Sequence, residues 1–114
     1  MEETLTINGI EYVSKENKQE GLEYVIIRTF SAGVHAGYLK SRKGKEVELI
    51  NTRRIWYWDG ACSLSQLSKD GTNAPDNCKF SCEIEKITLL EAIEIIPCTK
   101  KAIKSIKEVP EWKK

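Results

Sequence analysis

The feature that most constrains the fold is a block of three β-forming segments between positions 23 and 58. β-Branched and aromatic residues are concentrated in residues 23–30, 34–40 and 46–58, and these side chains suit the pleated surface of a sheet. Short turns that contain glycine separate the segments and allow the chain to reverse direction. The block therefore predicts a three-stranded antiparallel meander.

Further elements are predicted after the meander. Ser63 and Gly71 are residue types that begin and end a short helix. Residues 80–90 form a predicted strand, and residues 91–96 fit either a helix or a strand but are predicted as a strand from their isoleucine content. Thr99 can cap a last, lysine-rich helix. We expect an α+β domain with a small, mostly antiparallel sheet and one or two short helices.

The length of 114 residues suits one domain with a short extension. Asn8 and Gly9 stand between β-forming residues, which is a strong signal for a hairpin, and a polar stretch follows them. We expect an N-terminal hairpin and linker in residues 1–20 and the main α+β domain in residues 21–114.

Two positions predict irregularities in the meander. Gly37 lies inside the second strand, where glycine often marks a bulge or a close approach of two backbones. The alternation of the third strand changes near Asn51, and a bulge there would redirect the side chains that follow. Strand periodicity predicts that Arg54, Trp56 and Trp58 share one face, and it leaves open which face is the core.

The charge balance excludes some classes of function. There are 18 basic and 17 acidic residues, for a net charge of +1, whereas a general DNA-binding protein usually carries a clearly basic face. The apolar runs are too short to span a bilayer, and no targeting segment is visible, so we expect no membrane partner and a cytoplasmic location.

The cysteines are expected to be free thiols. Cys62, Cys78, Cys82 and Cys98 occur without a signal peptide, and a reducing compartment disfavours disulfides. Cys78 and Cys82 form the only close pair, whereas structural zinc sites often take ligands from two short knuckles. We therefore expect no metal, and a zinc site at this pair is the alternative.

The sequence contains no recognisable catalytic constellation. His35 is the only histidine and has no acidic partner nearby in sequence, so a surface or structural role is favoured over that of a general base. Cys62 precedes a helix start, but no base accompanies it. Glycine-rich phosphate loops and nucleophile elbows are also absent from the sequence. We expect a binding protein without a cofactor rather than an enzyme.

The densest candidate site is the string of arginines and aromatic residues at positions 52–58. An aromatic ring can stack on a base, and a neighbouring guanidinium can bind a phosphate or a carboxylate. The helix start that follows offers N–H groups that also favour anions. The predicted ligand-binding residues are Arg53, Arg54, Trp56, Trp58, Ser63, Ser65 and Gln66. In the alternative interpretation the tryptophans are core anchors and Arg54 lies beside them.

A second candidate is the small-residue turn at Ser31 and Gly33, with Gly37 nearby. Small residues there would allow a ligand or another chain to approach closely. The alternative is a simple tight turn between two strands.

Three strings of the sequence are distinctive: YVIIRTFSAGVHAGYL at residues 24–39, RRIWYWDGACSLSQLS at residues 53–68 and TLLEAIEIIP at residues 88–97. Together they resemble a family of short phage and prophage proteins, and the resemblance extends over about residues 22–112. The resemblance implies an origin and a host bacterial cytosol, but no activity.

These features lead to one expected function and two rivals. By analogy of role with small phage proteins that sequester host immune signals, we expect a phage accessory protein that binds a small anionic nucleotide-type signal, as a homo-oligomer. The main rival is a protein-binding inhibitor or structural accessory protein, in which the same aromatic residues form an interface. The weaker rival is an enzyme that degrades such a signal.

Overall fold

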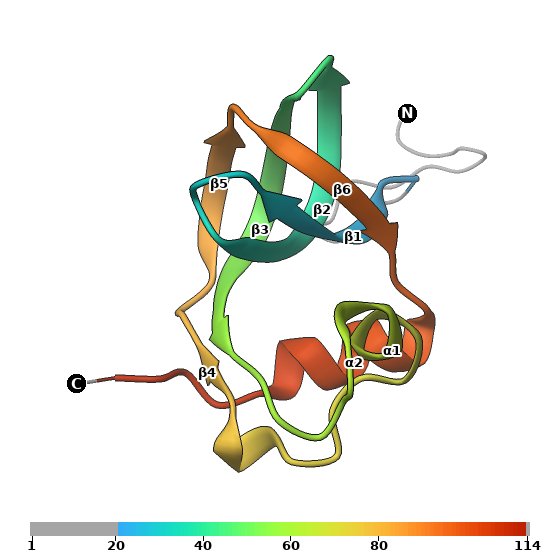
Figure 1. Ribbon diagram of the computed structural model, residues 1–114, viewed down its shortest axis with the longest axis vertical. Helices are drawn as coiled ribbons and strands as arrows, with labels where there is room; N and C mark the ends of the chain where they lie inside the picture. The colour runs from blue at the N-terminus through green and yellow to red at the C-terminus, as the bar shows by residue number, and fades with distance from the viewer. Residues whose placement is uncertain (1–20, 114) are drawn as a thin grey trace, which may run out of the picture.

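The structure, a computed structural model, describes residues 21–113, so the predicted hairpin and linker in residues 1–20 lie outside the described residues. The described chain forms an α+β domain with a mostly strand-built half and a half that holds the helices (Figure 1). The elements are β1 (Glu23–Thr29), β2 (Val34–Lys43), β3 (Glu46–Tyr57), α1 (Leu64–Asp70), a 3₁₀ turn η2 (Pro75–Asn77), β4 (Lys79–Phe80), β5 (Ile84–Leu89), β6 (Ala92–Pro97) and α2 (Lys100–Glu108).

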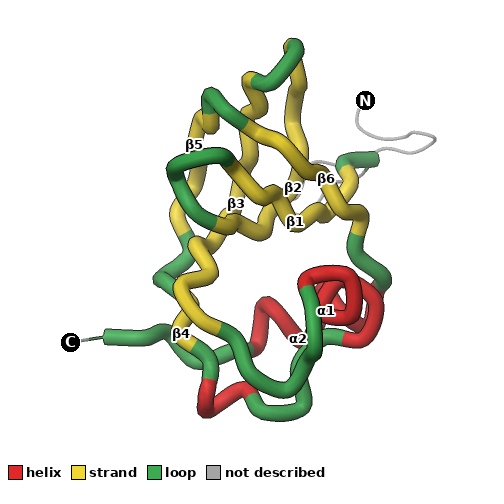
Figure 2. Tube along the Cα trace, viewed as in Figure 1, coloured by secondary structure: helices red, strands yellow, loops and turns green. Residues whose placement is uncertain are grey.

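All strands belong to one antiparallel sheet that does not close into a barrel. The order is β4-β3-β2-β1-β6, and β5 pairs with the first half of β3. The predicted meander is confirmed, because β1 pairs with β2 and β2 pairs with β3. The α+β class is confirmed as well, with the two helices lying together on one side of the sheet (Figure 2).

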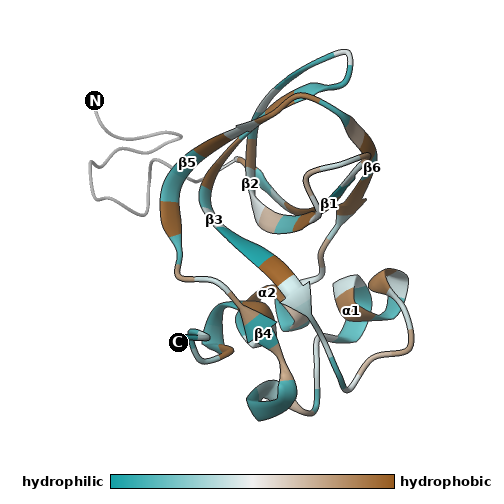
Figure 3. Ribbon diagram, turned by 60° about the vertical axis from the view of Figure 1, so that its left-hand side comes forward, coloured by the Kyte–Doolittle hydropathy of each residue, from teal (hydrophilic) through white to brown (hydrophobic). Residues whose placement is uncertain are grey.

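The sheet separates two hydrophobic clusters, and β1 is buried on both of its faces. The cluster under the helices, here called the helix-side core, contains Tyr24 and Ile26 of β1 together with Leu67 of α1 and Ile106 of α2. The cluster on the other face, here called the strand-side core, contains Val25, Ile27, Val47, Leu49, Leu89 and Ala92. Hydrophobic segments of β5 and β6 contribute to enclosing it (Figure 3).

The predicted bulge in β3 is confirmed at Asn51. Asn51 has φ +48°, a left-handed conformation that asparagine tolerates, and the register between β2 and β3 shifts at this point. Gly37 faces the bulge, and a Cβ added to it would lie 2.6 Å from the Cβ of Thr52. The bulge and the close approach predicted for Gly37 are therefore two sides of one irregularity, which redirects every side chain after position 51.

The two helices begin and end as predicted. The hydroxyl of Ser63 caps α1 by accepting from the N–H of Gln66, and the hydroxyl of Thr99 caps α2 by accepting from the N–H of Ala102. Gly71 ends α1 with φ +75°. The hydroxyl of Thr99 also donates to the carbonyl of Lys69, so the cap of one helix contacts the end of the other.

The prediction of one strand over residues 80–90 is wrong, because the structure divides it into β4 and β5. Phe80 lies opposite Ile55, and Ile84 lies opposite Thr52. The chain therefore advances four residues from β4 to β5 while the paired strand β3 advances only three. The surplus is taken up at Ser81, whose hydroxyl accepts from the N–H of Arg54. The second boundary difference is that β3 ends at Tyr57 rather than at position 58.

Candidate functional site

A groove of about 210 Å³ lies beside the second half of β3, where β4 and β5 separate, and we call it the Arg54 groove. Arginine, tryptophan and histidine side chains line it together with small polar and aliphatic residues. The lining residues are His35, Thr52, Arg54, Trp56, Ser81, Cys82, Ile84 and Ile87.

The Asn51 bulge determines which side chains of β3 reach this groove. Before the bulge, Val47 and Leu49 occupy the strand-side face, and after it Thr52, Arg54 and Trp56 line the groove instead. The predicted pairing of Arg54 and Trp56 on one face is therefore confirmed.

Arg54 and Trp56 form a stacked pair in the groove. The guanidinium carbon of Arg54 lies 5.0 Å from the centre of the Trp56 ring, within the range of a cation–π contact. Trp56 is 57% exposed. Among residues 21–113, the guanidinium of Arg54 has no hydrogen bond or ion pair, so its donors are available to an anion. The pair offers a flat surface next to a free positive charge.

His35 lies opposite Arg54 on β2 and is 1% exposed. Its Nε2 lies 2.9 Å from the carbonyl oxygen of Ala32, which can only accept, so Nε2 carries the proton and donates. Burial holds the pKa of His35 below its usual value, and the nearby charge of Arg54 acts in the same direction. The ring is therefore neutral near pH 7, and its Nδ1 is an acceptor without a partner among residues 21–113.

Arg53 is used differently from its neighbour. It is 4% exposed, and its guanidinium donates to three backbone carbonyls, those of Ser81 at 2.8 Å, Ile106 at 2.9 Å and Val109 at 2.7 Å. Its positive charge also lies at the C-terminal end of α2, where carbonyl dipoles favour a cation. Arg53 was predicted to bind ligand, but it is buried and its Nε and Nη1 donate to the backbone, so it does not belong to the candidate site.

Trp58 does not share a face with Trp56, so that prediction is wrong. Trp58 lies just beyond the end of β3, where strand alternation no longer applies. Its ring packs against the helix-side core, and its Nε1 donates to the carbonyl of Ala61 at 3.2 Å. The alternative interpretation, a tryptophan that supports the core, describes Trp58, whereas Trp56 faces the groove.

The other predicted site residues are not brought to the groove. Ser63 and Gln66 bond to the backbone at the start of α1, with Gln66 accepting from the N–H of Cys62 and Ser63 accepting from that of Gln66. Ser65 is an exposed residue of the same helix. Gly33, next to Ser31 in its turn, has φ +85° and accepts from the N–H and hydroxyl of Thr29. These contacts describe a helix cap and a tight turn.

The sequence did not indicate Ser81, Cys82, Ile84 and Ile87 as lining residues. They reach the groove because the chain breaks between β4 and β5, and no local pattern marks that break. Cys82 is exposed in the groove, whereas Cys78 is buried. Within residues 21–113, no cluster of three or more His, Cys, Asp or Glu side chains could hold a metal ion.

Comparisons with known proteins give a family but no relative of known activity. None of the helices in residues 21–113 has the length and apolar character needed to cross a membrane. No curated protein matches the chain. No solved structure matches it either. The family model described as a domain of unknown function (DUF6948) matches residues 22–106, which cover the sheet and most of α2, and the chain therefore belongs to this family.

Proposed function

We propose that the protein binds a small, planar, anionic ligand of nucleotide type in the Arg54 groove and holds it without converting it. The observation that carries the proposal is the guanidinium of Arg54, which has no hydrogen bond or ion pair among residues 21–113 and stacks on the exposed ring of Trp56. A base can stack on this flat pair, and a phosphate can accept from the free donors of the guanidinium. A neutral, buried His35 also lines the groove.

The size of the groove limits what one chain can hold. At about 210 Å³ it is smaller than the roughly 300–1,000 Å³ typical of sites that enclose a complete small ligand. One ring and an attached anionic group fit this space better than a whole dinucleotide. The proposal therefore includes association of two or more copies, in which a neighbouring surface completes the enclosure.

The biological role that we propose follows from the sequence resemblance to phage proteins. A protein that binds a nucleotide signal of host defence and does not release it quickly would lower the free concentration of that signal in the bacterial cytosol. Such a role requires an abundant, tight binder, and the arginine and tryptophan of the groove supply charge and a stacking surface for binding.

The second candidate function is binding of another protein. Trp56 and Ile84 line the groove and are both exposed apolar side chains, and Tyr57, which follows Trp56 in sequence, is also exposed. Aromatic residues and arginine are enriched where proteins contact each other, so the same residues could anchor a protein partner.

The test compares ligand binding by four proteins: wild type, Arg54→Ala, Trp56→Ala and a matched control, Arg28→Ala. Arg28 is also a partly exposed arginine, but it is paired with Glu94 at 2.9 Å and does not line the groove. Titration calorimetry with AMP, cyclic mononucleotides, cyclic dinucleotides and ADP-ribose measures the dissociation constants. We expect the groove variants to weaken binding by about 1–3 kcal/mol, roughly 5- to 150-fold, through loss of the stack or of the charged hydrogen bond.

The control separates a site from a general charge effect. Loss of binding in both groove variants, with Arg28→Ala unchanged, supports the proposal. Equal weakening by Arg54→Ala and Arg28→Ala, with Trp56→Ala like wild type, would indicate unspecific attraction of anions. If wild type binds none of the ligands, while Trp56→Ala reduces capture of a defined protein from infected cells, the protein-binding candidate replaces the proposed function.

A further inference from the structure

Three large apolar side chains are exposed together at the end of the sheet that is remote from the helices. Phe30 follows β1 and is 78% exposed, while Leu90 and Ile93 at the turn between β5 and β6 are 68% and 46% exposed. Isolated exposed apolar residues are ordinary, but a group from two neighbouring turns is typical of an interaction surface. We call this group, with the residues between its members, the turn patch.

Hydrogen bonds hold the segments of the turn patch in place. The N–H of Phe30 donates to the carbonyl of Glu91 at 3.0 Å, and the hydroxyl of Ser31 donates to the carboxylate of Glu91 at 2.6 Å. The N–H of Ala92 donates to the carbonyl of Lys45 at 2.9 Å, which adds the β2–β3 hairpin to the assembly. Because the three segments are already fixed to one another, a partner would bind a preformed surface and would lose little entropy in ordering it.

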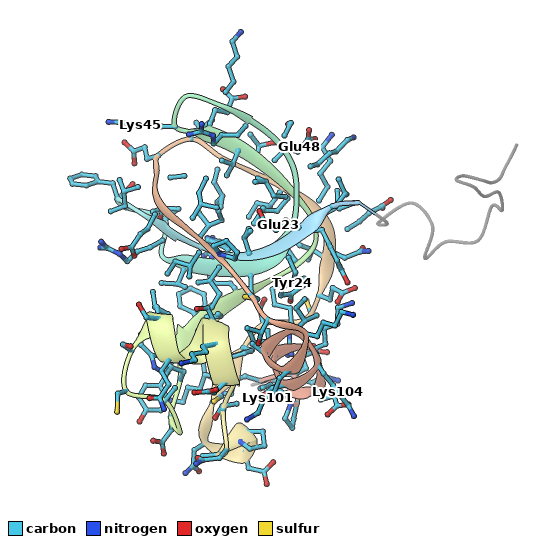
Figure 4. The ribbon with its side chains drawn as sticks, turned by 90° about the vertical axis from the view of Figure 1, so that its right-hand side faces the viewer. Glu23, Tyr24, Lys45, Glu48, Lys101 and Lys104 are labelled. Carbon is cyan, nitrogen blue, oxygen red and sulfur yellow. The ribbon has the colours of Figure 1, made fainter. Side chains whose placement is uncertain are left out.

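The patch borders a hollow of about 320 Å³, lined by Phe30, Lys45, Glu91 and Ile93. It therefore combines apolar side chains with one positive and one negative charge. Neither Lys45 nor Glu91 forms an ion pair with any residue in the range 21–113. Lys45 extends from the hairpin away from the body of the molecule (Figure 4).

We propose that the turn patch is a self-association surface, on which a second copy of the chain docks about a two-fold axis. A partner that fits must offer an anion to Lys45 and a cation to Glu91, which line the same hollow, and a second copy supplies both charges. In this arrangement Lys45 of each copy faces Glu91 of the other, and each Phe30 ring enters the partner's hollow. Surfaces of this kind are self-complementary, as an isologous interface requires.

The proposed function includes association of two or more copies, and the turn patch is the surface that we assign to this association. The assignment rests on that association and does not depend on ligand binding. The turn patch and the Arg54 groove share no lining residue, so the two can be tested separately. A patch of three apolar side chains lies at the small end of interface sizes, where complexes are weak and reversible. The dimer should therefore form and dissociate within the micromolar range.

The first experiment measures mass against concentration by sedimentation equilibrium, from about 1 µM to about 1 mM, the range of a weak interface. The variants are Phe30→Asp and a matched control, Trp112→Asp, which changes an exposed aromatic residue outside both the patch and the Arg54 groove. We expect wild type and the control to dimerise equally and Phe30→Asp to remain at the mass of one 13.0 kDa chain. A monomeric wild type throughout this range overturns the proposal, and so does a dimer that Phe30→Asp leaves unchanged.

The second experiment uses charge reversal to test the two-fold arrangement. Lys45→Glu alone places two acidic groups opposite each other, and Glu91→Lys alone places two basic groups opposite each other, so each variant should dimerise at least tenfold more weakly. An equimolar mixture should form a heterodimer with both contacts restored, and the double variant should form a homodimer. Failure of both the mixture and the double variant to recover association would overturn the two-fold contact.

The outcomes also separate this inference from the proposed function. Ligand titration of the Phe30→Asp monomer measures binding to the Arg54 groove of one chain without the second copy that completes the enclosure, whereas mass measurements without ligand report on the turn patch alone. Dimerisation through the patch with no nucleotide binding would remove the proposed ligand and leave the interface. Nucleotide binding by a chain that never dimerises would remove the interface and leave the proposed ligand.

Discussion

Arg53 and Arg54 are neighbours in sequence but serve opposite faces of the sheet. Arg53 is buried on the helix side, where three backbone carbonyls accept from its guanidinium. Arg54 is half-buried on the other side, where its guanidinium stacks on Trp56 and has no hydrogen-bond partner among residues 21–113. The same side chain therefore stabilises the fold in one position and is available to a ligand in the next.

The partners of a charged group distinguish a structural role from a functional one better than its residue type does. A buried arginine needs its donors satisfied within the protein, because an unsatisfied charge there is strongly unfavourable. A partly exposed arginine can remain solvated until an anion replaces water. The carbonyls that Arg53 satisfies come from Ser81 and from the end of α2, so this single side chain joins β3 to two distant segments.

The largest effect is expected for Arg53→Ala. Each hydrogen bond from a charged donor contributes about 1.5–3 kcal/mol, and the change removes the guanidinium from the carbonyl of Val109 and leaves that of Ile106 with only the N–H of Val109, at 3.3 Å. We expect the free energy of unfolding to fall by about 3 kcal/mol or more, a large share of the roughly 5–15 kcal/mol typical of a domain. The free energy of unfolding is measured by urea denaturation, with tryptophan fluorescence as the signal.

Arg53→Lys is the matched control for this prediction. Lysine keeps the charge, but its compact ammonium cannot reproduce the planar fork of a guanidinium, so recovery should be partial. Ordinary surface substitutions change the free energy of unfolding by about 0.5 kcal/mol or less. If Arg53→Ala changes it by no more than that, Arg53 does not stabilise the fold, and its contrast with Arg54 is wrong.

The second effect concerns the irregularity that separates the two arginines. A Cβ at position 37 would lie 2.6 Å from the Cβ and 3.0 Å from the Cα of Thr52, closer than packed atoms allow. Gly37→Ala should therefore lower the free energy of unfolding by about 1–3 kcal/mol, the usual cost of overpacking. Ser41→Ala, at an exposed position of the same strand, is the control and should unfold like wild type. Equal stability of both variants would mean that the bulge adjusts without strain.

Much of the fold could be predicted because its signals are local. Ser63 and Thr99 are N-caps with a visible residue preference, and the meander is visible in its β-branched segments. The Asn51 bulge was predictable from a fault in alternation. The break between β4 and β5 was not, because it depends on how Phe80 and Ile84 pair with residues of β3 that are far away in sequence.

The candidate site was predictable only in part for the same reason. The string at positions 52–58 indicated Arg54 and Trp56, but it could not assign Arg53 to the helix side or Trp58 to the helix-side core. Both assignments depend on where the strand ends and on what α2 places beneath it. His35 joins the groove through its register with Arg54, a long-range fact that its own sequence neighbours do not reveal.

The third effect is a dependence of the free energy of unfolding on pH. It arises from His35, which lines the Arg54 groove. Burial lowers its pKa in the folded state, whereas the unfolded value is about 6.5. Above that pH the group is neutral in both states and contributes no pH dependence. As the pH falls below about 6.5, only the unfolded chain takes up a proton, so stability decreases by at most about 1.4 kcal/mol per pH unit.

His35→Gln should remove this contribution, because a glutamine amide can still donate to the carbonyl of Ala32 but does not titrate. The measurement is the free energy of unfolding of both proteins at intervals between pH 5 and pH 8. The difference between them should change with pH only below about 6.5. A constant difference over the whole range would mean that the imidazole is protonated to the same extent in both states, contrary to its burial.

The smallest effect on stability is expected for the groove pair itself. Trp56 is 57% exposed, so Trp56→Ala loses little buried area, and the cation–π contact with Arg54 contributes only about 0.5–1 kcal/mol at such a site. Arg54→Ala should change the free energy of unfolding by less than about 1 kcal/mol, since it breaks no hydrogen bond or ion pair within residues 21–113. Trp58→Ala is the control on the helix side, where loss of packing should cost clearly more. If Trp56→Ala destabilises the protein as much as Trp58→Ala, both tryptophans belong to the core, and the groove loses the flat surface on which the proposed ligand stacks.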